Sequence, residues 1–213
     1  MSLIITGTDT HVGKTVVSAL LLLRYASRQP WYWKPVATGA RHRDSFSIDR
    51  WTDAPVIEEG YLYHPPVSPH LAARRARRPV DPAGLVRSYR MMDALPLVIE
   101  GIGGALVPLT DDGYLFADLA RALRLPCLVV ARSTLGTINH TLLTLEALRR
   151  RRVPIAGVVF NGPPDAENRN AVERFGRTRV MGQVPPLGRL TAARLRRAAR
   201  RFDARGRLRR LLA

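Results

Sequence analysis

Residues 7–15, GTDTHVGKT, constrain the fold of this chain more than any other stretch. They follow an apolar run at residues 3–5 and precede a mostly apolar run at residues 16–23, a pattern that predicts a strand, a tight loop and a helix. In such a loop the backbone N–H groups at the helix start face an anion, a lysine reaches the outer phosphates and a hydroxyl faces Mg²⁺. Lys14 and Thr15 hold those two places, so we interpret residues 7–15 as a phosphate loop.

The match to the usual pattern is imperfect by one residue. In G-x-x-x-x-G-K-[ST] the first glycine would stand at position 8, where this chain has Thr8, and the glycine is Gly7 instead. A loop that merely joins a strand to a helix is the alternative interpretation. The strand before it and the helix after it favour phosphate binding.

The two lysines of the chain are candidate functional residues. Of the 34 Lys and Arg residues only Lys14 and Lys34 are lysines, and both lie in loops marked by Gly or Pro after predicted strands. A compact ammonium and a planar guanidinium are not interchangeable, so a lysine kept in an Arg-rich chain is a functional candidate. The alternative is that two lysines remain by chance.

Length and composition predict one domain over residues 1–213 with enough apolar residues for a full core. The start lacks a basic region followed by a long apolar run, and no apolar run is long enough to span a membrane, so we expect a cytoplasmic protein. Cys127 lies in an apolar run and is expected to be a buried strand residue.

The net charge of +17 raises nucleic acid or an anionic membrane as partners. Residues 191–213 are Arg-rich, but Leu195, Ala198, Ala199 and Phe202 recur at helical spacing, and the arginines show no regular interleaving with aromatic residues. We therefore interpret residues 192–202 as a helix with a solvated basic face, and expect no nucleic acid and no membrane as partners.

Apolar runs alternate with helical patterns along the chain, which predicts an α/β fold, a mostly parallel central sheet with helices on both faces. The expected strands are residues 3–6, 32–37, 97–100, 127–131, 155–161 and 179–182. The expected main helices are residues 14–27, 115–123, 138–151, 166–175 and 192–202. Ligands collect at the carboxyl ends of the strands in such sheets.

Three polar groups stand near these strand ends. Lys34 begins the stretch 34–39 in which the second strand stops, Glu100 closes the third, and Asp49 lies between them in the chain. An acid at a strand tip beside a phosphate loop commonly serves Mg²⁺. Alternatively, Asp49 caps a helix that follows it, and Glu100 pairs with an arginine.

Six motifs in this order resemble the dethiobiotin synthetase family over residues 3–187. They are GTDTHVGKT, KPVATG, VSPHLAARRARRP, VIEGIGGALVPL, LFADLARALRLPCLVVARSTLGTINHTLLTLEAL and VFNG. The resemblance implies a homodimeric phosphate-loop enzyme that uses ATP, Mg²⁺ and CO₂ to close a ureido ring on 7,8-diaminononanoate, through a carbamate and a carbamic-phosphoric anhydride.

The resemblance also implies roles for individual residues. It makes Lys34 and Lys14 catalytic, places Thr15, Asp49 and Glu100 around the metal, and has Asn161 read adenine. The nucleotide residues it implies are His11, Val12, Gly13, Lys14, Thr15, Val16, Asp49, Glu100, Gly101, Ile102, Gly103, Asn161, Gly162, Pro185, Pro186 and Leu187. The substrate residues it implies are Thr10, Thr38, Ser68, Gly103, Gly136 and Asn139, the last two reaching across the dimer.

Some positions depart from the family. The family often has Glu at the position of His11 and a further acid beyond the Pro-Pro-Leu loop, where this chain has Gly188 and Arg189. Asp53 competes with Asp49 as the metal carboxylate. No family motif covers the Arg-rich tail.

Two other classes share the fold. A partition-type or Mrp-type switch ATPase carries a signature lysine where this chain has Asp9. A glutamine-dependent amidoligase of corrin synthesis needs an additional domain with a nucleophilic cysteine, for which this chain leaves no room.

Overall fold

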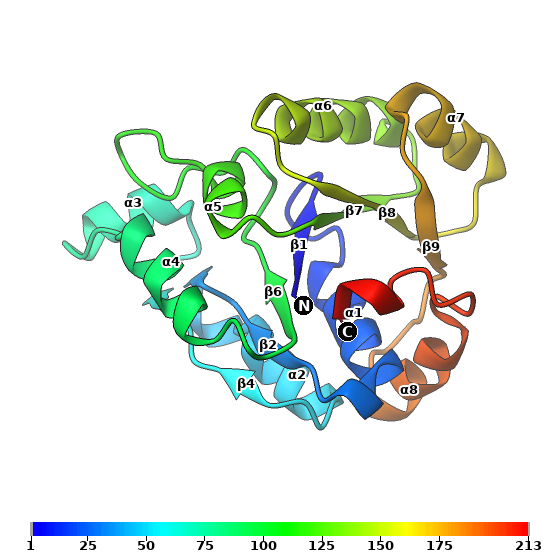
Figure 1. Cartoon of the computed structure of the whole chain (residues 1–213), viewed down its shortest axis with the longest axis horizontal. Helices are drawn as coiled ribbons and strands as arrows, with labels where there is room; N and C mark the ends of the chain where they lie inside the picture. The colour runs from blue at the N-terminus through cyan, green and yellow to red at the C-terminus, as the bar shows by residue number, and fades with distance from the viewer. Residues whose placement is uncertain (1, 213) are drawn as a thin grey trace.

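A seven-stranded sheet forms the centre of the computed structural model, which describes residues 2–212 (Figure 1). Its strand order is β4-β2-β6-β1-β7-β8-β9, and every pairing within it is parallel. The strands are β1 (Leu3–Gly7), β2 (Trp31–Trp33), β4 (Val56–Ile57), β6 (Leu97–Glu100), β7 (Cys127–Arg132), β8 (Ile155–Asn161) and β9 (Val180–Val184). The α/β fold with a parallel sheet predicted from the sequence is confirmed.

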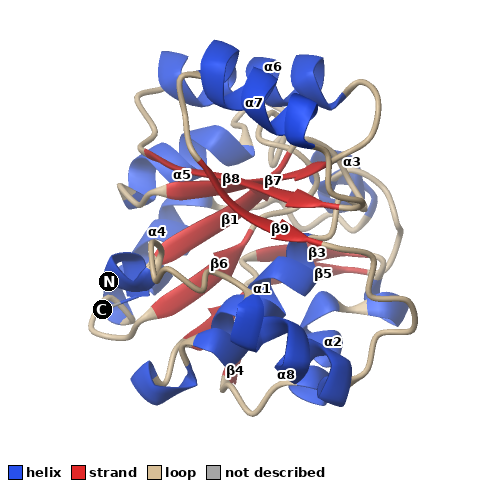
Figure 2. Ribbon diagram, turned by 90° about the vertical axis from the view of Figure 1, so that its right-hand side faces the viewer, coloured by secondary structure: helices blue, strands red, loops and turns tan. Residues whose placement is uncertain are grey.

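Helices cover both faces of this sheet, as Figure 2 shows. The helices are α1 (Lys14–Arg24), α2 (Asp44–Trp51), α3 (Pro69–Arg75), α4 (Pro82–Met91), α5 (Phe116–Leu123), α6 (Thr137–Arg150), α7 (Ala166–Gly176) and α8 (Ala192–Arg201). Helices α1, α2 and α8 lie on one face, and α4 to α7 lie on the other. None of the described helices is long and apolar enough to cross a membrane.

Two apolar clusters, one on each face, hold the layers together. In β1, Ile4 packs into one cluster while Leu3 and Ile5 pack into the other, because successive strand side chains point to opposite faces. This double burial is why the central strands appear in the sequence as unbroken apolar runs.

The predicted strand at residues 32–37 divides in two. β2 ends at Trp33, and β3 (Val36–Thr38) pairs instead with β5 (Tyr61–Tyr63) in a separate two-stranded sheet. Pro35 has no N–H to donate to a ladder, so the chain can leave the main sheet here. The division leaves Lys34 just past the end of β2, at the edge where ligands bind.

Three helices, α2, α3 and α4, lie outside the main helices expected from the sequence. The 14–27 helix is shorter than expected, because α1 ends at Arg24 and a short 3₁₀ turn follows. Cys127 is fully buried in β7, as expected.

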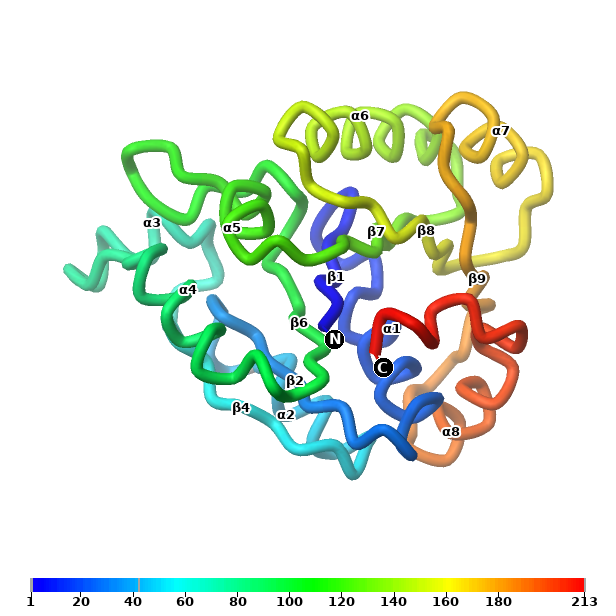
Figure 3. Tube along the Cα trace, in the orientation of Figure 1, coloured from blue at the N-terminus to red at the C-terminus, as the bar shows by residue number. Residues whose placement is uncertain are grey.

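The C-terminal segment folds back over α1. Leu195 and Phe202 pack into the apolar cluster on the α1 face, and so do Leu208 and Leu212. Asp203 is buried and accepts hydrogen bonds from the Tyr25 hydroxyl and from the backbone N–H groups of Arg207 and Leu208. The two ends of the chain lie close together (Figure 3).

Candidate active site

The phosphate loop joins β1 to α1 at the carboxyl edge of the sheet. Gly13, the residue before the helix, has φ +97° and ψ +27°, a left-handed conformation natural to glycine. The Lys14 ammonium donates to the Asp9 carbonyl across the loop at 3.0 Å. Burial of that ammonium lowers the pKa of Lys14 to about 8, although Glu100 and Asp44 oppose the shift. The loop therefore presents backbone N–H groups and one buried ammonium.

A cavity of about 780 Å³ opens beside the phosphate loop, and we call it the phosphate-loop cavity. It brings together most of the residues that the sequence put forward for nucleotide and substrate. Those that line it are Thr10, His11, Gly13, Lys14, Thr15, Val16, Lys34, Thr38, Ser68, Glu100, Ile102 and Gly103. They come from loops that follow different strands, as expected for a site at the carboxyl edge of a parallel sheet.

A buried charge cluster forms one wall of this cavity. Lys34 is 4% exposed, and its ammonium pairs with Asp44 and with Glu100, the latter at 3.2 Å. Burial disfavours the ammonium, but the two carboxylates outweigh burial and hold the pKa of Lys34 above its ordinary value. In the same way burial opposes ionisation of Asp44, and Lys34 overcomes it, so the pKa of Asp44 lies below its ordinary value. Lys34 and Asp44 are therefore both charged at neutral pH.

Glu100 is fixed from four directions. Its Oε1 accepts from Thr15 at 2.9 Å and from Lys34, while its Oε2 accepts from Ser18 at 2.9 Å and from the Tyr32 hydroxyl at 3.0 Å. The hydroxyl donors come from α1 and β2, which flank β6. With 1% exposure, Glu100 needs these donors because a buried carboxylate without partners is costly. The charged partner of Glu100 is Lys34, so the alternative that Glu100 pairs with an arginine is wrong.

The second acid in the cluster is Asp44, and Asp49 does not reach it. Asp44 Oδ1 accepts from the Thr15 hydroxyl at 2.8 Å. Asp49 lies on the same helix but is exposed, because five residues carry it about 140° around the helix axis. Asp53 is also exposed and pairs with Arg196. Among the described residues neither Asp49 nor Asp53 bonds to Thr15 or Lys34, whereas Asp44 bonds to both. Helix α2 begins at Asp44, so Asp49 does not cap a helix that follows it.

The donors around Thr15 suit a small hard cation. Two carboxylates, Asp44 and Glu100, converge on one hydroxyl, and all three groups offer oxygen. Mg²⁺ in nucleotide sites takes one or two carboxylates and completes its shell with waters and phosphate oxygens. Among residues 2–212 no group of three or more His, Cys, Asp or Glu side chains could hold a metal alone. The residues therefore fit a cation that arrives with phosphates, not a closed protein cage.

Asn161, at the end of β8, lies against the phosphate loop. Its side-chain amide donates to the Val12 carbonyl at 3.0 Å. A Cβ added to Gly13 would lie 2.0 Å from the Asn161 Nδ2, so the glycine is required by contact as well as by its φ. Val12 itself is buried and can meet a ligand only through its backbone.

We expect Gly13→Ala to lower the free energy of unfolding by about 2–3 kcal/mol, from left-handed strain and from the displaced Asn161 amide. Gly113→Ala is the matched control, because Gly113 has φ +90° but nothing within 4 Å of its added Cβ, and should lose only about 1 kcal/mol. Urea unfolding measures both. Equal losses would show that the contact with Asn161 carries no weight.

The Pro-Pro-Leu loop, which the resemblance assigns to the nucleotide, borders a separate cavity. Pro185, Pro186 and Leu187 line a space of about 310 Å³ with residues of α8 and with Leu20 of α1. Gly162, just after β8, lies beside the start of this loop, since its N–H donates to the Val184 carbonyl at 2.9 Å. Gly101 is a packing glycine: an added Cβ would lie 2.5 Å from the Phe116 ring.

Gly136 and Asn139 lie outside the phosphate-loop cavity. Both are exposed at the start of α6, where Gly136 is the N-cap with φ +89°. No side-chain cap is made there: the Thr137 hydroxyl donates to the Arg132 carbonyl, and among the described residues Asn139 makes no side-chain hydrogen bond. Within one chain, therefore, the structure does not bring these residues to Lys34 and Thr38.

Sequence reasoning missed three residues of the charge cluster: Ser18, Tyr32 and Asp44. Ser18 and Tyr32 are hidden inside apolar runs, but Ser18 falls one helical turn after Lys14 and its hydroxyl also donates to the Lys14 carbonyl. Asp44 carried a signal, since an acid directly before an apolar-periodic stretch is typical of a helix start.

Comparison with known proteins gives the chain its family. A family model described as an AAA domain matches residues 1–194. An "ATP-dependent dethiobiotin synthetase BioD" of Paramagnetospirillum magneticum is 48% identical over 89% of this chain and 90% of that protein. A protein of the same name from Agrobacterium fabrum is 45% identical over 92% and 91%.

Solved structures share the fold at much lower identity. A ParA family ATPase from Chlorobium tepidum superposes with a TM-score of 0.57 at 10% identity, covering 98% of this chain and 91% of that one. The MinC:MinD cell division complex of Aquifex aeolicus gives a TM-score of 0.60 at 12% identity, covering 95% of each chain. These two support the fold alone, whereas identities of 40–48% over most of the chain confirm the resemblance found in the motifs. The chain belongs to the family of ATP-dependent dethiobiotin synthetases.

Proposed function

We propose that this chain closes the ureido ring of dethiobiotin, using ATP to insert CO₂ between the two amines of 7,8-diaminononanoate. The observation that carries the proposal is the position of Lys34. Its buried ammonium lies in the same cavity as the phosphate loop, where a carbamate and the outer phosphate of ATP have to meet. Family membership supports the substrates.

The reaction needs an activated carbamate. One amine of the substrate adds CO₂ and loses a proton to give a carbamate, whose carbonyl carbon is a poor electrophile. A carbamate oxygen then attacks the γ-phosphorus of ATP and ADP leaves, giving a carbamic-phosphoric anhydride. The second amine attacks the carbonyl carbon, phosphate leaves, and the amine proton is lost as the ring closes. Proximity of the second amine favours this last step.

The protein's main contribution is charge compensation. ATP, the carbamate and the phosphoryl group in transfer are all anionic, and fixed positive groups stabilise charge that develops between them. Lys14 serves the phosphates from the phosphate loop, and Lys34 serves the carbamate and the transferred phosphoryl group from the charge cluster beside it. Thr38 and Ser68 line the cavity beside Lys34, where they can donate to the substrate.

The proposed metal is Mg²⁺, held by Thr15, Asp44 and Glu100. Bound with ATP, it would offset charge on the β- and γ-phosphates. Asp44 takes the place that the sequence analysis gave to Asp49. Lys34 pairs with both carboxylates and so positions them, and it holds the pKa of Asp44 below its ordinary value.

Asp44→Asn should raise the Mg²⁺ concentration needed for half-maximal activity by about ten-fold or more, because one charged ligand is lost. Asp49→Asn is the matched control, since it removes the same charge from an exposed position on the same helix, and should leave that concentration unchanged. Magnesium titrations of ATP turnover measure both. The assignment fails if Asp49→Asn has the larger effect.

We propose that the nucleotide base lies near Asn161, Gly162 and the loop from Pro185 to Leu187. Asn161 can both donate and accept, as a reader of adenine must, although its amide now donates to Val12. The side-chain carbonyl oxygen of Asn161 remains to accept from a base.

We also propose a homodimer that completes the substrate site. Exposed Leu106, Leu135 and Leu143 lie on or beside α6, with Leu135 fully exposed at its start. Such an apolar surface is typical of an interface. Gly136 and Asn139 lie beside it, ready to reach the partner subunit's cavity. We place this dimer in the cytoplasm.

One experiment tests the function directly. The purified chain is incubated with diaminononanoate, bicarbonate and ATP with Mg²⁺, and dethiobiotin is sought by mass spectrometry. We expect one product per ATP consumed. Release of ADP without product would instead favour a switch ATPase of the partition or Mrp type.

A further inference from the structure

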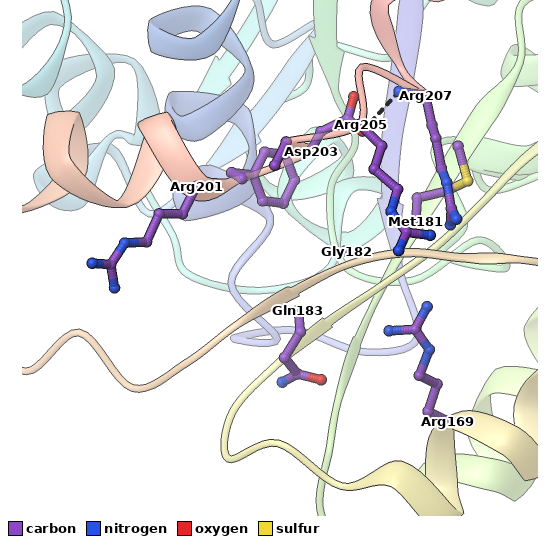
Figure 4. A pocket seen from close by; sticks show the side chains of 10 residues that line it. Arg169, Met181, Gly182, Gln183, Arg201, Asp203, Arg205 and Arg207 are labelled. Carbon is purple, nitrogen blue, oxygen red and sulfur yellow. Dashed lines mark hydrogen bonds between the residues drawn. The ribbon is translucent and has the colours of Figure 1, made fainter.

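A second charged cavity lies over the edge strand β9 (Figure 4). The residues that line it follow those of the charge cluster in the sequence by more than sixty positions. Its volume is about 230 Å³, and its walls come from α7, β9, the end of α8 and the segment that follows α8. Four arginines line it, Arg169, Arg201, Arg205 and Arg207, and we call it the arginine pocket. The proposed reaction uses none of these residues.

Three of the arginines face one another. Figure 4 shows the guanidinium groups of Arg169, Arg205 and Arg207 directed toward the same space, while Arg201 points away. Arg169 pairs weakly with Glu173, at 3.7 Å. Among residues 2–212 no carboxylate lies within ion-pairing distance of Arg205 or Arg207. Like charges gathered in one cavity repel each other, and a bound anion would relieve that repulsion.

The acid in the wall is already engaged. Asp203 is 6% exposed, and its oxygens accept from the Tyr25 hydroxyl and from the N–H groups of Arg207, at 2.8 Å, and Leu208, at 2.7 Å. It makes no hydrogen bond to a guanidinium. Instead it fixes the backbone turn that carries Arg207, two residues from Arg205, so these two arginines start from a defined backbone position. Less backbone entropy is then lost when an anion binds.

The geometry points to a phosphate-bearing small molecule as the ligand, and we propose that the arginine pocket binds one. Guanidinium groups match phosphate oxygens with paired N–H donors. Single-stranded nucleic acid fits less well, because it needs exposed aromatic rings for stacking and the pocket's aromatic residue, Phe202, is 4% exposed.

The test is calorimetric titration with inorganic pyrophosphate in the absence of metal. The phosphate loop would also bind this probe, so the measurements use a Lys14→Ala background. We expect saturable binding at one site per chain. Adding Arg205→Gln and Arg207→Gln should weaken it by about ten-fold or more, since two charge-assisted hydrogen-bond donors are lost.

The matched control removes the same charge elsewhere. Arg90 and Arg121 are exposed on α4 and α5, and among the described residues neither side chain makes a hydrogen bond or ion pair. Arg90→Gln with Arg121→Gln should change the affinity by less than about two-fold, as expected for remote screened charges. Equal weakening by both pairs, or no saturable binding, would overturn the proposal. A single-stranded oligonucleotide that binds more tightly than pyrophosphate and depends on Arg205 and Arg207 would also overturn it.

A second measurement does not depend on any variant. Crystals of the wild-type chain soaked in tungstate, a heavy analogue of phosphate, should show anomalous density between Arg169, Arg205 and Arg207. Density at the phosphate loop alone would contradict a second anion site.

Discussion

Lys34→Arg should fold and bind ATP but lose about 100-fold or more in turnover, the usual scale for removing one fixed group that stabilises developing charge. The ammonium of Lys34 is a compact point charge, buried between Asp44 and Glu100 in the wall of the phosphate-loop cavity. A guanidinium is larger and planar, and its charge is spread over a fork that prefers to lie flat against one carboxylate. The charge is kept, but its position relative to the carbamate is lost.

Three measurements separate the causes of such a loss. Dethiobiotin formation gives turnover, calorimetry gives ATP affinity, and thermal unfolding shows whether the buried cluster tolerates the larger side chain. Arg121→Lys is the control for an exchange of the same two residue types at an exposed position, and should behave as wild type. If Lys34→Arg keeps near wild-type turnover, Lys34 has no catalytic role.

Mixing two inactive variants should restore activity if the substrate site is shared between subunits. Lys34→Ala removes the catalytic ammonium and Asn139→Ala removes the proposed carboxylate cradle. Random exchange of equal amounts makes half of the dimers mixed, and each mixed dimer has one intact site of two. The recovered activity should therefore be about a quarter of wild type.

The control pair combines Lys34→Ala with Glu100→Ala. Both residues line the cavity of one chain, so every site in a mixed dimer is damaged and no activity should return. Mass labels on the two chains establish that exchange has occurred. A Lys34→Ala and Asn139→Ala mixture that stays inactive after proven exchange would place the whole site within one chain.

The central sheet could be predicted from the sequence because its strands are buried on both faces. Unbroken apolar runs such as the one in β7 leave little choice of structure. Strand ends then indicated Lys34 and Glu100, since polar residues directly after such runs fall at the ligand edge. The two-stranded sheet of β3 and β5 could not be predicted, because three-residue strands are too short for a periodic pattern.

The choice of the metal carboxylate depends on structure that spacing in the sequence does not provide. Asp44, Asp49 and Asp53 all stand between Lys34 and β6, and chain distance does not distinguish them. What distinguishes them is which residue begins α2 and which face of that helix meets Thr15. Helix boundaries are the least certain feature of a sequence-based prediction, and only five residues separate Asp49, the acid expected at the metal, from Asp44, the acid that lies beside Thr15.

The strand order has a consequence for how the protein forms. β6 lies between β1 and β2 in the sheet, with Ile5 opposite Glu100 and Trp33 opposite Ile99, yet β6 follows both strands by more than sixty residues along the chain. Until that long loop closes, β1 has no strand beside it and β2 has only the two-residue β4, and the closure is an entropically costly step. During synthesis the nascent chain cannot gain stability from nucleotide until β6 has emerged and inserted. We expect ATP to act late, as a ligand that traps the finished sheet and slows its unfolding, and not as a template for early folding.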